Sequence, residues 1–272
     1  MYLEYWGFDR PPFNVGNAGA GYFRSPTQVE ALARLSFLVE DQQRLGVLVG
    51  PSGIGKSILL DAFARRQRLC GHQIVHQNLL GMQHDEFILA VADDLGESAV
   101  AGDTLSLLWR RIEDRLIVNQ YQQLPTVFLL DDADEAENDV LTAIVRLAQW
   151  KSASEARITI VIACNEDRVR LLGSRLIDLC ELRIDLGTWE SPDTAAFVRE
   201  VCIRAGRSEP VFDDSGLARL HEISKGVPRR IRQVGELALL AGAAAELKSI
   251  DGQTIDDVVL ELSVDEQSEA VY

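Results

Sequence analysis

The chain has 272 residues, an apolar content of 47% and a formal net charge of −15 at pH 7. This length is near the upper limit for a single hydrophobic core, so we expect one large domain and one smaller domain. The acidic balance disfavours a broad nucleic-acid-binding surface, because such surfaces need lysine and arginine to neutralise phosphates.

Several sequence features predict a soluble cytoplasmic protein. No stretch approaches the ~20 uncharged apolar residues of a membrane span. The start of the chain, residues 1–4, lacks the basic and apolar regions of a signal peptide. The cysteines form no C-x-x-C pair and are expected to be reduced core residues. They are Cys70, Cys164, Cys180 and Cys202.

The N-terminal segment is rich in aromatic residues and glycine. Residues 2–23 show neither helical nor strand periodicity, so we expect an ordered apron over residues 1–24. Ser25 is then a helix-capping residue, Pro26 suits the first helical position, and Gln28 completes a capping box. The apolar spacing that follows predicts a helix to about Val39.

The strongest motif in the chain is a P-loop, which follows the apolar run 45–49 and precedes a helical pattern. Its glycines let consecutive N–H groups face phosphate oxygens, and the helix adds its positive end. We expect Lys56 to reach the β- and γ-phosphates and Ser57 to supply a hydroxyl ligand to Mg²⁺. The predicted nucleotide-binding residues are Gly50, Pro51, Ser52, Gly53, Ile54, Gly55, Lys56, Ser57 and Ile58.

Beyond the P-loop, apolar strands alternate with helical patterns up to about residue 187. The expected strands are 73–77, 126–130, 157–164 and 181–186. The expected helices are 58–70, 85–95, 103–122 and 137–150. Unbroken apolar strands that alternate with helices predict a parallel sheet covered on both faces. We therefore assign residues 25–187 to one α/β domain.

From Ser191 onward the pattern becomes entirely helical. Helices are expected at 191–205, 213–223, 227–247 and 254–262. They predict a small all-helical domain over residues 188–263. The chain has seven acidic residues and no lysine or arginine after Lys248. We interpret residues 264–272 as a frayed acidic tail.

Two acids end the apolar strand 126–130. Asp131 is where a carboxylate would complete Mg²⁺ coordination opposite the P-loop. Asp132 would lie next to the attacking water and could orient or deprotonate it, and Glu135 is the alternative residue for this role. Asn165 follows the strand 157–164 and would lie near the γ-phosphate if the two strands are neighbours.

Two groups of basic residues are further candidates. Arg175 precedes the last strand and could reach a neighbouring subunit's nucleotide, where an arginine contributes ~10³–10⁵ in rate. Arg168, Arg170 and Arg183 compete for this role. Arg229 belongs to a basic cluster at the start of a long helix, where the helix dipole favours a compensating anion. Nucleotide phosphate is the first candidate for that anion, and an acidic partner or nucleic acid is the alternative.

These spaced motifs together resemble those of AAA+ ATPases. The resemblance makes Gly50–Ser57 Walker A, Val127–Asp132 Walker B, Asn165 sensor 1, Arg175 an arginine-finger candidate and Gly226–Arg229 sensor 2. It implies an α/β P-loop NTPase with a small helical lid that binds ATP and Mg²⁺ between the two domains. It also implies an ATP-dependent homo-oligomer in which Asp132, Asn165, Arg175 and Arg229 support hydrolysis.

The N-terminal segment narrows the resemblance. Tyr5-Trp6-Gly7-Phe8, Pro12-Phe13 and Phe23-Arg24-Ser25 are similar to the start of ATPases of the general secretion pathway protein A (ExeA) type. This implies control of the assembly of a secretion-type or envelope-associated complex through a protein partner, with nucleic acid not expected as a partner. The alternative functions are a slow nucleotide-gated oligomerisation switch and a DNA-associated regulator of the transposition type.

One departure from the family concerns catalysis. The family usually ends Walker B with Asp-Glu, whereas this chain has Asp131-Asp132, which is one methylene shorter at the water-polarising position. A displacement of ~1 Å can cost on the order of 10²-fold in rate. We therefore expect slow hydrolysis, unless Glu135 or a small strand shift compensates.

Overall fold

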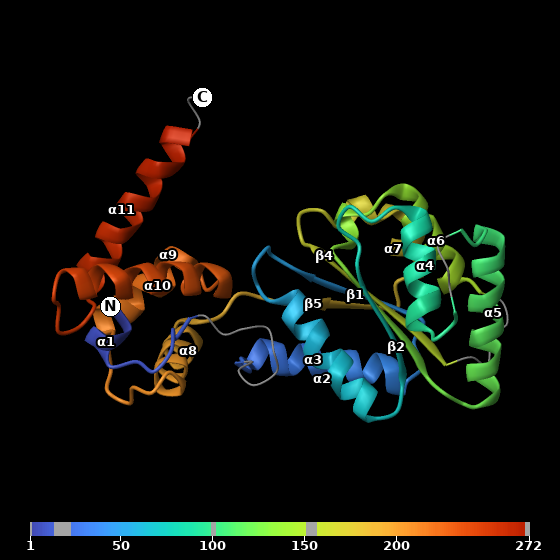
Figure 1. The fold of residues 1–272 in the computed structure, drawn as a ribbon, viewed down its shortest axis with the longest axis horizontal. Helices are drawn as coiled ribbons and strands as arrows, with labels where there is room; N and C mark the ends of the chain where they lie inside the picture. The colour runs from blue at the N-terminus through green and yellow to red at the C-terminus, as the bar shows by residue number, and fades with distance from the viewer. Residues whose placement is uncertain (1, 14–22, 99–101, 151–156, 270–272) are drawn as a thin grey trace. The chain divides into compact units, whose positions relative to one another are not determined.

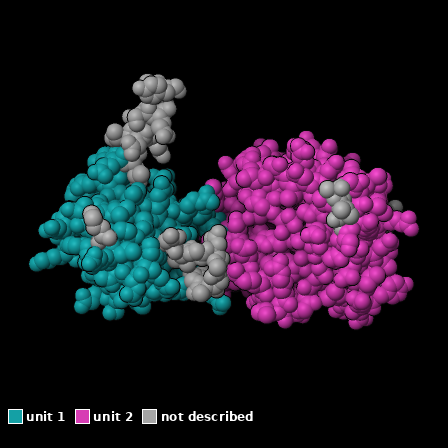
Figure 2. All heavy atoms as spheres, in the orientation of Figure 1, with its two compact units in different colours: residues 1–25, 53–55, 188–272 teal, residues 26–52, 56–187 magenta. Residues whose placement is uncertain are grey.

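The structure is a computed structural model that describes residues 2–13, 23–98, 102–150 and 157–269, with side chains up to residue 261. Contacts divide the chain into two compact units (Figure 2). One unit comprises residues 26–52 and 56–187, and we call it the α/β unit. The other comprises residues 1–25, 53–55 and 188–272, and we call it the helical unit.

The described part of the α/β unit contains a five-stranded sheet in the order β2-β3-β4-β1-β5. The strands are β1 (Leu45–Gly50), β2 (Gln73–Asn78), β3 (Thr126–Asp131), β4 (Ile158–Asn165) and β5 (Leu182–Asp185). Every pairing is parallel. β1 and β3 are buried along their whole length, which explains their unbroken apolar sequences. The predicted parallel sheet is confirmed.

Helices cover the sheet (Figure 1). They are α2 (Pro26–Glu40), α3 (Lys56–Leu69), α4 (His84–Asp94), α5 (Leu105–Tyr121), α6 (Asn138–Ala148) and α7 (Gly173–Leu179). Two short 3₁₀ turns, η1 (Ala133–Glu135) and η3 (Val169–Leu172), follow β3 and β4. Phe128 and Leu130 of β3 share one buried core with Ile112 of α5 and Ile144 of α6. α2 and α3 contact each other and β1.

The helical unit is built from α8 (Ser191–Arg204), α9 (Asp214–Ser224), α10 (Pro228–Ala244) and α11 (Gly252–Glu269). The aromatic N-terminal segment belongs to its core, because Trp6 donates a hydrogen bond from Nε1 to the carbonyl of Leu239 at 2.8 Å. Gly235 and Gly242 leave room for the rings. A Cβ at Gly235 would lie 2.5 Å from Phe13, and a Cβ at Gly242 would lie 2.9 Å from Trp6.

Several local expectations were wrong. Residues Tyr2–Trp6 form a short helix, α1, because three aromatic side chains anchor this turn to the rest of the unit. α11 runs to Glu269, beyond the expected end at residue 262, because no glycine or proline follows Gly252 to stop it. Cys70 is exposed in the turn after α3 and Cys180 is only partly buried, whereas Cys164 and Cys202 are core residues. No helix within the described ranges is long and apolar enough to cross a membrane.

Candidate functional site

The P-loop connects β1 to α3 at the carboxyl edge of the sheet. β1 ends at Gly50 and α3 begins at Lys56. Between them, Gly53 and Gly55 have φ angles of +79° and +107°. Residues with side chains rarely adopt such angles, so the tight curl of this loop requires glycine at both positions.

Lys56 lies buried at the centre of this edge, with 7% of its surface exposed. Its ammonium nitrogen donates hydrogen bonds to the carbonyl oxygens of Gly50 at 2.8 Å and Pro51 at 3.2 Å. It also donates to Oδ1 of Asn165 at 2.9 Å. Burial lowers the pKa of Lys56, and nearby carboxylates, above all Asp134, oppose this shift. The arrangement holds a cation where a P-loop places phosphates.

Asp131 ends β3 and is 3% exposed. One carboxylate oxygen accepts a hydrogen bond from the amide of Asp132 at 3.0 Å. Burial raises the pKa of Asp131, whereas a hydrogen bond from the hydroxyl of Ser57 opposes the shift. This carboxylate and hydroxyl are adjacent hard oxygen ligands, which fits Mg²⁺ held mainly by waters and phosphates. The described residues contain no cluster of three acidic, histidine or cysteine side chains that would form a complete protein metal site.

Asp132 follows β3 in a left-handed conformation, with φ of +50° and ψ of +41°. Aspartate tolerates this conformation better than most residues. Its Oδ2 accepts a hydrogen bond from Nδ2 of Asn78 at 2.8 Å. Asn78 ends β2 and is paired in register with Asp131. Sequence reasoning missed Asn78, although its position at the end of the predicted neighbouring strand was a usable signal.

Asn165 ends β4, and β4 is the neighbour of β3, as required for the two tips to approach. Its backbone N–H donates to Oδ1 of Asp134 at 3.2 Å, and its side-chain Nδ2 donates to Oδ2 of the same residue at 2.8 Å. Asp134 lies in η1 and is 4% exposed. The sequence analysis missed Asp134, three residues after Asp131 in the run D-D-A-D-E.

Glu135 and Arg168 form an ion pair, with a second hydrogen bond from Arg168 Nη2 to Glu135 Oε2 at 3.1 Å. Nε of Arg168 also lies 3.6 Å from Oδ2 of Asp134. Arg168 and Glu135 therefore satisfy each other within one chain. Arg183, another candidate arginine finger, is paired with Asp185 at 2.7 Å.

Arg175 is exposed on α7, a short helix that the sequence analysis did not predict. It therefore does not directly precede β5, as had been expected. It lines an open hollow of about 630 Å³. Glu113, Thr142, Val145, Arg146, Gln149 and Trp150 line the rest. Among the described residues Arg175 makes no ion pair.

Arg229 lies in the first turn of α10, in the helical unit. Its backbone N–H donates to the carbonyl of Gly53 at 3.2 Å, a contact within that unit. Nearby Gly226 has φ of +69°, and a Cβ there would lie 2.1 Å from the carbonyl oxygen of Trp189. Backbone packing therefore explains why the predicted sensor 2 motif has glycine at this position, independently of any role in nucleotide binding.

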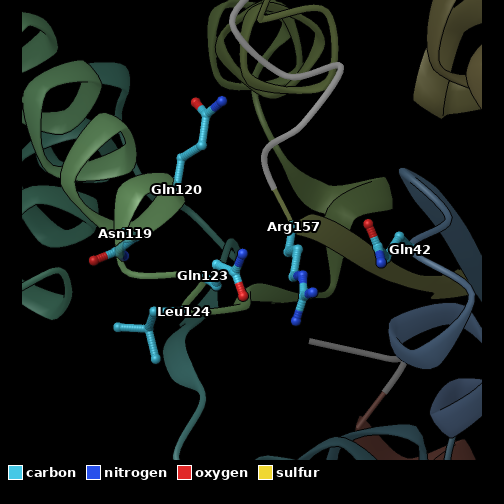
Figure 3. A pocket seen from close by; sticks show the side chains of 6 residues that line it. All are labelled: Gln42, Asn119, Gln120, Gln123, Leu124 and Arg157. Atoms are coloured by element: carbon cyan, nitrogen blue, oxygen red, sulfur yellow. The ribbon is translucent and has the colours of Figure 1, made fainter.

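A second hollow, of about 310 Å³, lies at the opposite edge of the sheet, where β3 and β4 begin (Figure 3). Its lining is almost entirely polar: Gln42, Asn119, Gln120, Gln123, Leu124 and Arg157. Gln123 and Arg157 lie in the middle of the view, between Asn119 and Leu124 on one side and Gln42 on the other. No pattern in the sequence indicates this hollow.

Comparison with known proteins agrees with this geometry. Residues 39–172 match the family model described as AAA domain. The chain is 26% identical over 255 residues to General secretion pathway protein A of Aeromonas hydrophila. The match covers 90% of this chain and 45% of that protein, so the chain spans about half the length of this relative.

Solved structures share the fold at low sequence identity. The Aeropyrum pernix ORC1 protein in complex with DNA has a TM-score of 0.67 and 16% identity, covering 92% of this chain and 69% of that chain. Cdc6p from Pyrobaculum aerophilum has a TM-score of 0.69 and 17% identity, covering 88% and 67%. The Thermotoga maritima RuvB Holliday junction branch migration motor has a TM-score of 0.59 and 13% identity, covering 86% and 69%.

Proposed function

We propose that the chain binds ATP with Mg²⁺ and hydrolyses it, and the match of residues 39–172 to the AAA domain and the similarity to General secretion pathway protein A support this proposal. The finer proposal is that the nucleotide state controls assembly of a secretion-type or envelope-associated complex. The similarity to a protein named General secretion pathway protein A supports this pathway, and the partner would be a protein of that system.

One observation carries the ATPase proposal. The buried ammonium of Lys56 lies between two P-loop carbonyls and Oδ1 of Asn165, at the carboxyl edge of a parallel sheet. A cation at this place is fit to bind the β- and γ-phosphates, because opposite charge and backbone donors converge there. Bound Mg²⁺ would neutralise charge on these phosphates, and Asp131 and Ser57 are the residues that would hold it.

We propose that Asp132, rather than Glu135, orients the attacking water. The carboxylate of Glu135 is paired with the charged guanidinium of Arg168, whereas the carboxylate of Asp132 accepts one hydrogen bond, from the uncharged amide of Asn78. A single hydrogen bond to a charged group has a net value of about 1.5–3 kcal/mol, so Asp132 is more readily released than Glu135, which is held by an ion pair with two hydrogen bonds. Asp132 would then orient the water and accept its proton.

We further propose that the active form is an ATP-dependent homo-oligomer in which Arg175 acts on a neighbour's nucleotide. Of the four candidate arginines, Arg168 and Arg183 are neutralised within their own chain, whereas Arg170 and Arg175 are exposed and make no ion pair among the described residues. We choose Arg175 of these two because the resemblance to AAA+ ATPases gives it this role. Arg229 is the proposed second arginine that would support hydrolysis from the helical unit.

The decisive experiment measures phosphate release and particle mass together. Wild-type protein is expected to release phosphate and to gain mass by light scattering when ATP is added. Lys56→Ala and Arg175→Ala proteins should each be inactive alone, and mixing them should restore part of the turnover, because each supplies what the other lacks. Equal release by wild type and Lys56→Ala would refute the ATPase proposal.

A slow oligomerisation switch is the second candidate function. The short carboxylate of Asp132 and its hydrogen bond to Asn78 favour it, because both keep the base away from water. Assembly with ATP and with a non-hydrolysable analogue, accompanied by negligible phosphate release, would support the switch. Rapid release would exclude it.

A further inference from the structure

Asp134 is a buried carboxylate to which the sequence analysis assigned no role. Its side chain has no exposed surface, although an isolated buried charge is strongly unfavourable. Both of its oxygens are used by one residue, since Oδ1 accepts from the backbone N–H of Asn165 and Oδ2 accepts from the side-chain Nδ2. A costly buried carboxylate whose two oxygens both accept hydrogen bonds from the same residue has the geometry of a positioning residue.

The two partners of Asn165 determine which way its amide faces. A carboxylate only accepts hydrogen bonds, and an ammonium group only donates them. Nδ2 must therefore face Asp134, and Oδ1 must face Nζ of Lys56, which lies 2.9 Å away. This leaves an acceptor, and not a donor, on the P-loop side of Asn165.

Arg168 supports the same arrangement from the other side. Its Nε lies 3.6 Å from Oδ2 of Asp134, and its Nη2 donates to the backbone carbonyl of Asp134 at 3.4 Å. Its own backbone N–H donates to the carbonyl of Asn165 at 3.1 Å. The guanidinium supplies the positive charge that a buried carboxylate requires.

We propose that Asp134 is the positioning residue for Asn165 and makes this asparagine act through its carbonyl oxygen. In the site, Oδ1 of Asn165 then accepts hydrogen bonds from Lys56 or from the attacking water, and Nδ2, held by Asp134, does not donate to the γ-phosphate. This inference rests on the proposed ATP hydrolysis. If Asp134 is lost, the amide is free to turn, so turnover falls more than nucleotide binding does.

The kinetic test exchanges the two side chains. In Asp134→Asn, the new NH₂ group at residue 134 faces an N–H donor of Asn165, so one of the two hydrogen bonds is lost. We expect kcat to fall about 10- to 100-fold with little change in KM. In Asn165→Asp, two carboxylates face each other, and activity should fall at least as far. The double variant Asp134→Asn/Asn165→Asp restores the donor–acceptor pairing and keeps an oxygen toward Lys56, so it should be more active than either single variant.

This design separates the two possible roles of Asn165. If Asn165 works as a donor to phosphate, the double variant stays as inactive as Asn165→Asp, because aspartate has no proton to donate, and the proposal is overturned. Asp93→Asn is the matched control, since Asp93 is exposed on α4 and should behave as wild type.

A readout that needs no turnover keeps this inference distinct from the ATPase proposal. In wild-type protein the side-chain NH₂ resonances of Asn165 should be dispersed by the carboxylate, and Asp134→Asn should move them toward ordinary values while Asp93→Asn leaves them in place. If wild type fails to hydrolyse ATP but these shifts occur, only the proposed function fails. Unchanged Asn165 resonances in folded Asp134→Asn protein would overturn the positioning role.

Discussion

The side-chain oxygen of Asn165 lies 2.9 Å from the ammonium nitrogen of Lys56, which joins the tip of β4 to the P-loop. The sheet enforces this contact, because Asn165 pairs in register with Gly50, the last residue of β1 before the P-loop. Two parallel strands thus fix the distance between Asn165 and the P-loop that precedes Lys56. Backbone pairing sets this arrangement without any contribution from a nucleotide.

Replacing Lys56 should abolish both nucleotide binding and turnover. Lys56→Ala removes the cation that three oxygens hold at the P-loop, and loss of one preorganised charged donor typically costs about 10²- to 10³-fold in rate. Binding of a fluorescent ATP analogue and phosphate release measure the two effects. Lys248→Ala, which changes an exposed lysine, is the control. Retention of most of the turnover by Lys56→Ala would contradict the assignment.

Lengthening Asp132, the second acid of the proposed Walker B motif, should speed hydrolysis. Asp132→Glu returns the missing methylene and brings the carboxylate closer to the attacking water, so we expect kcat to rise by about 10-fold or more. Asp132→Asn should remove nearly all turnover, whereas Glu135→Gln should leave it close to wild type, because Glu135 is paired with Arg168. A large loss of turnover in Glu135→Gln with none in Asp132→Asn would show that Glu135, and not Asp132, orients the attacking water.

The sheet, the P-loop and the proximity of Asn165 were predictable from sequence for physical reasons. Strands that are buried on both faces have unbroken apolar sequences, and the P-loop glycines have left-handed φ angles that limit the choice of residue. The position of Asn165 near the P-loop could be predicted because the carboxyl ends of parallel strands meet at one edge of a sheet.

Contacts between distant polar side chains were not predictable in the same way. Asp134, Asn78 and Arg168 have ordinary neighbours in the sequence, and their roles appear only when η1, β2 and η3 come together at one edge of the sheet. The short helices α1 and α7 have five and seven residues, too few for a clear helical period. Arg175 was therefore expected directly before a strand and lies on a helix.

Neutralising Asp131 should make the protein more stable and less able to bind Mg²⁺. Burial raises the pKa of Asp131 above its ordinary value of 3.8, so the folded chain holds this proton more tightly than the unfolded chain does. The free energy of unfolding therefore falls as pH rises through the window from 3.8 to the raised pKa, and the cost persists above it. Asp131→Asn removes that cost and can still accept the hydrogen bonds of Ser57 and the Asp132 amide.

Urea unfolding at several pH values between about 4 and about 7 measures this effect. The stability difference between Asp131→Asn and wild type should grow as pH rises, while Mg²⁺-dependent ATP binding weakens in the variant. Asp178→Asn, an exposed change on α7, should show no such trend. A stability difference that shrinks with rising pH would contradict the assigned sign.

Gly226 should be required for folding of the helical unit independently of Arg229. Its φ is +69°, and an added Cβ would lie 2.1 Å from the carbonyl oxygen of Trp189, whose own N–H bonds to the Gly226 carbonyl at 3.0 Å. Because backbone cannot yield as a flexible side chain does, we expect Gly226→Ala to cost about 1–3 kcal/mol or more. Gly187→Ala is the matched control, because a Cβ there meets no atom within 4 Å.

Tryptophan fluorescence can report unfolding of the helical unit alone. In a background with Trp109→Phe and Trp150→Phe, the remaining tryptophans are Trp6 and Trp189, and both are buried in the helical unit. Gly226→Ala should lower the urea midpoint of that signal while Gly187→Ala leaves it nearly unchanged. Equal midpoints for the two variants would show that the backbone relaxes around the new methyl group, and the glycine of this motif would then need another explanation.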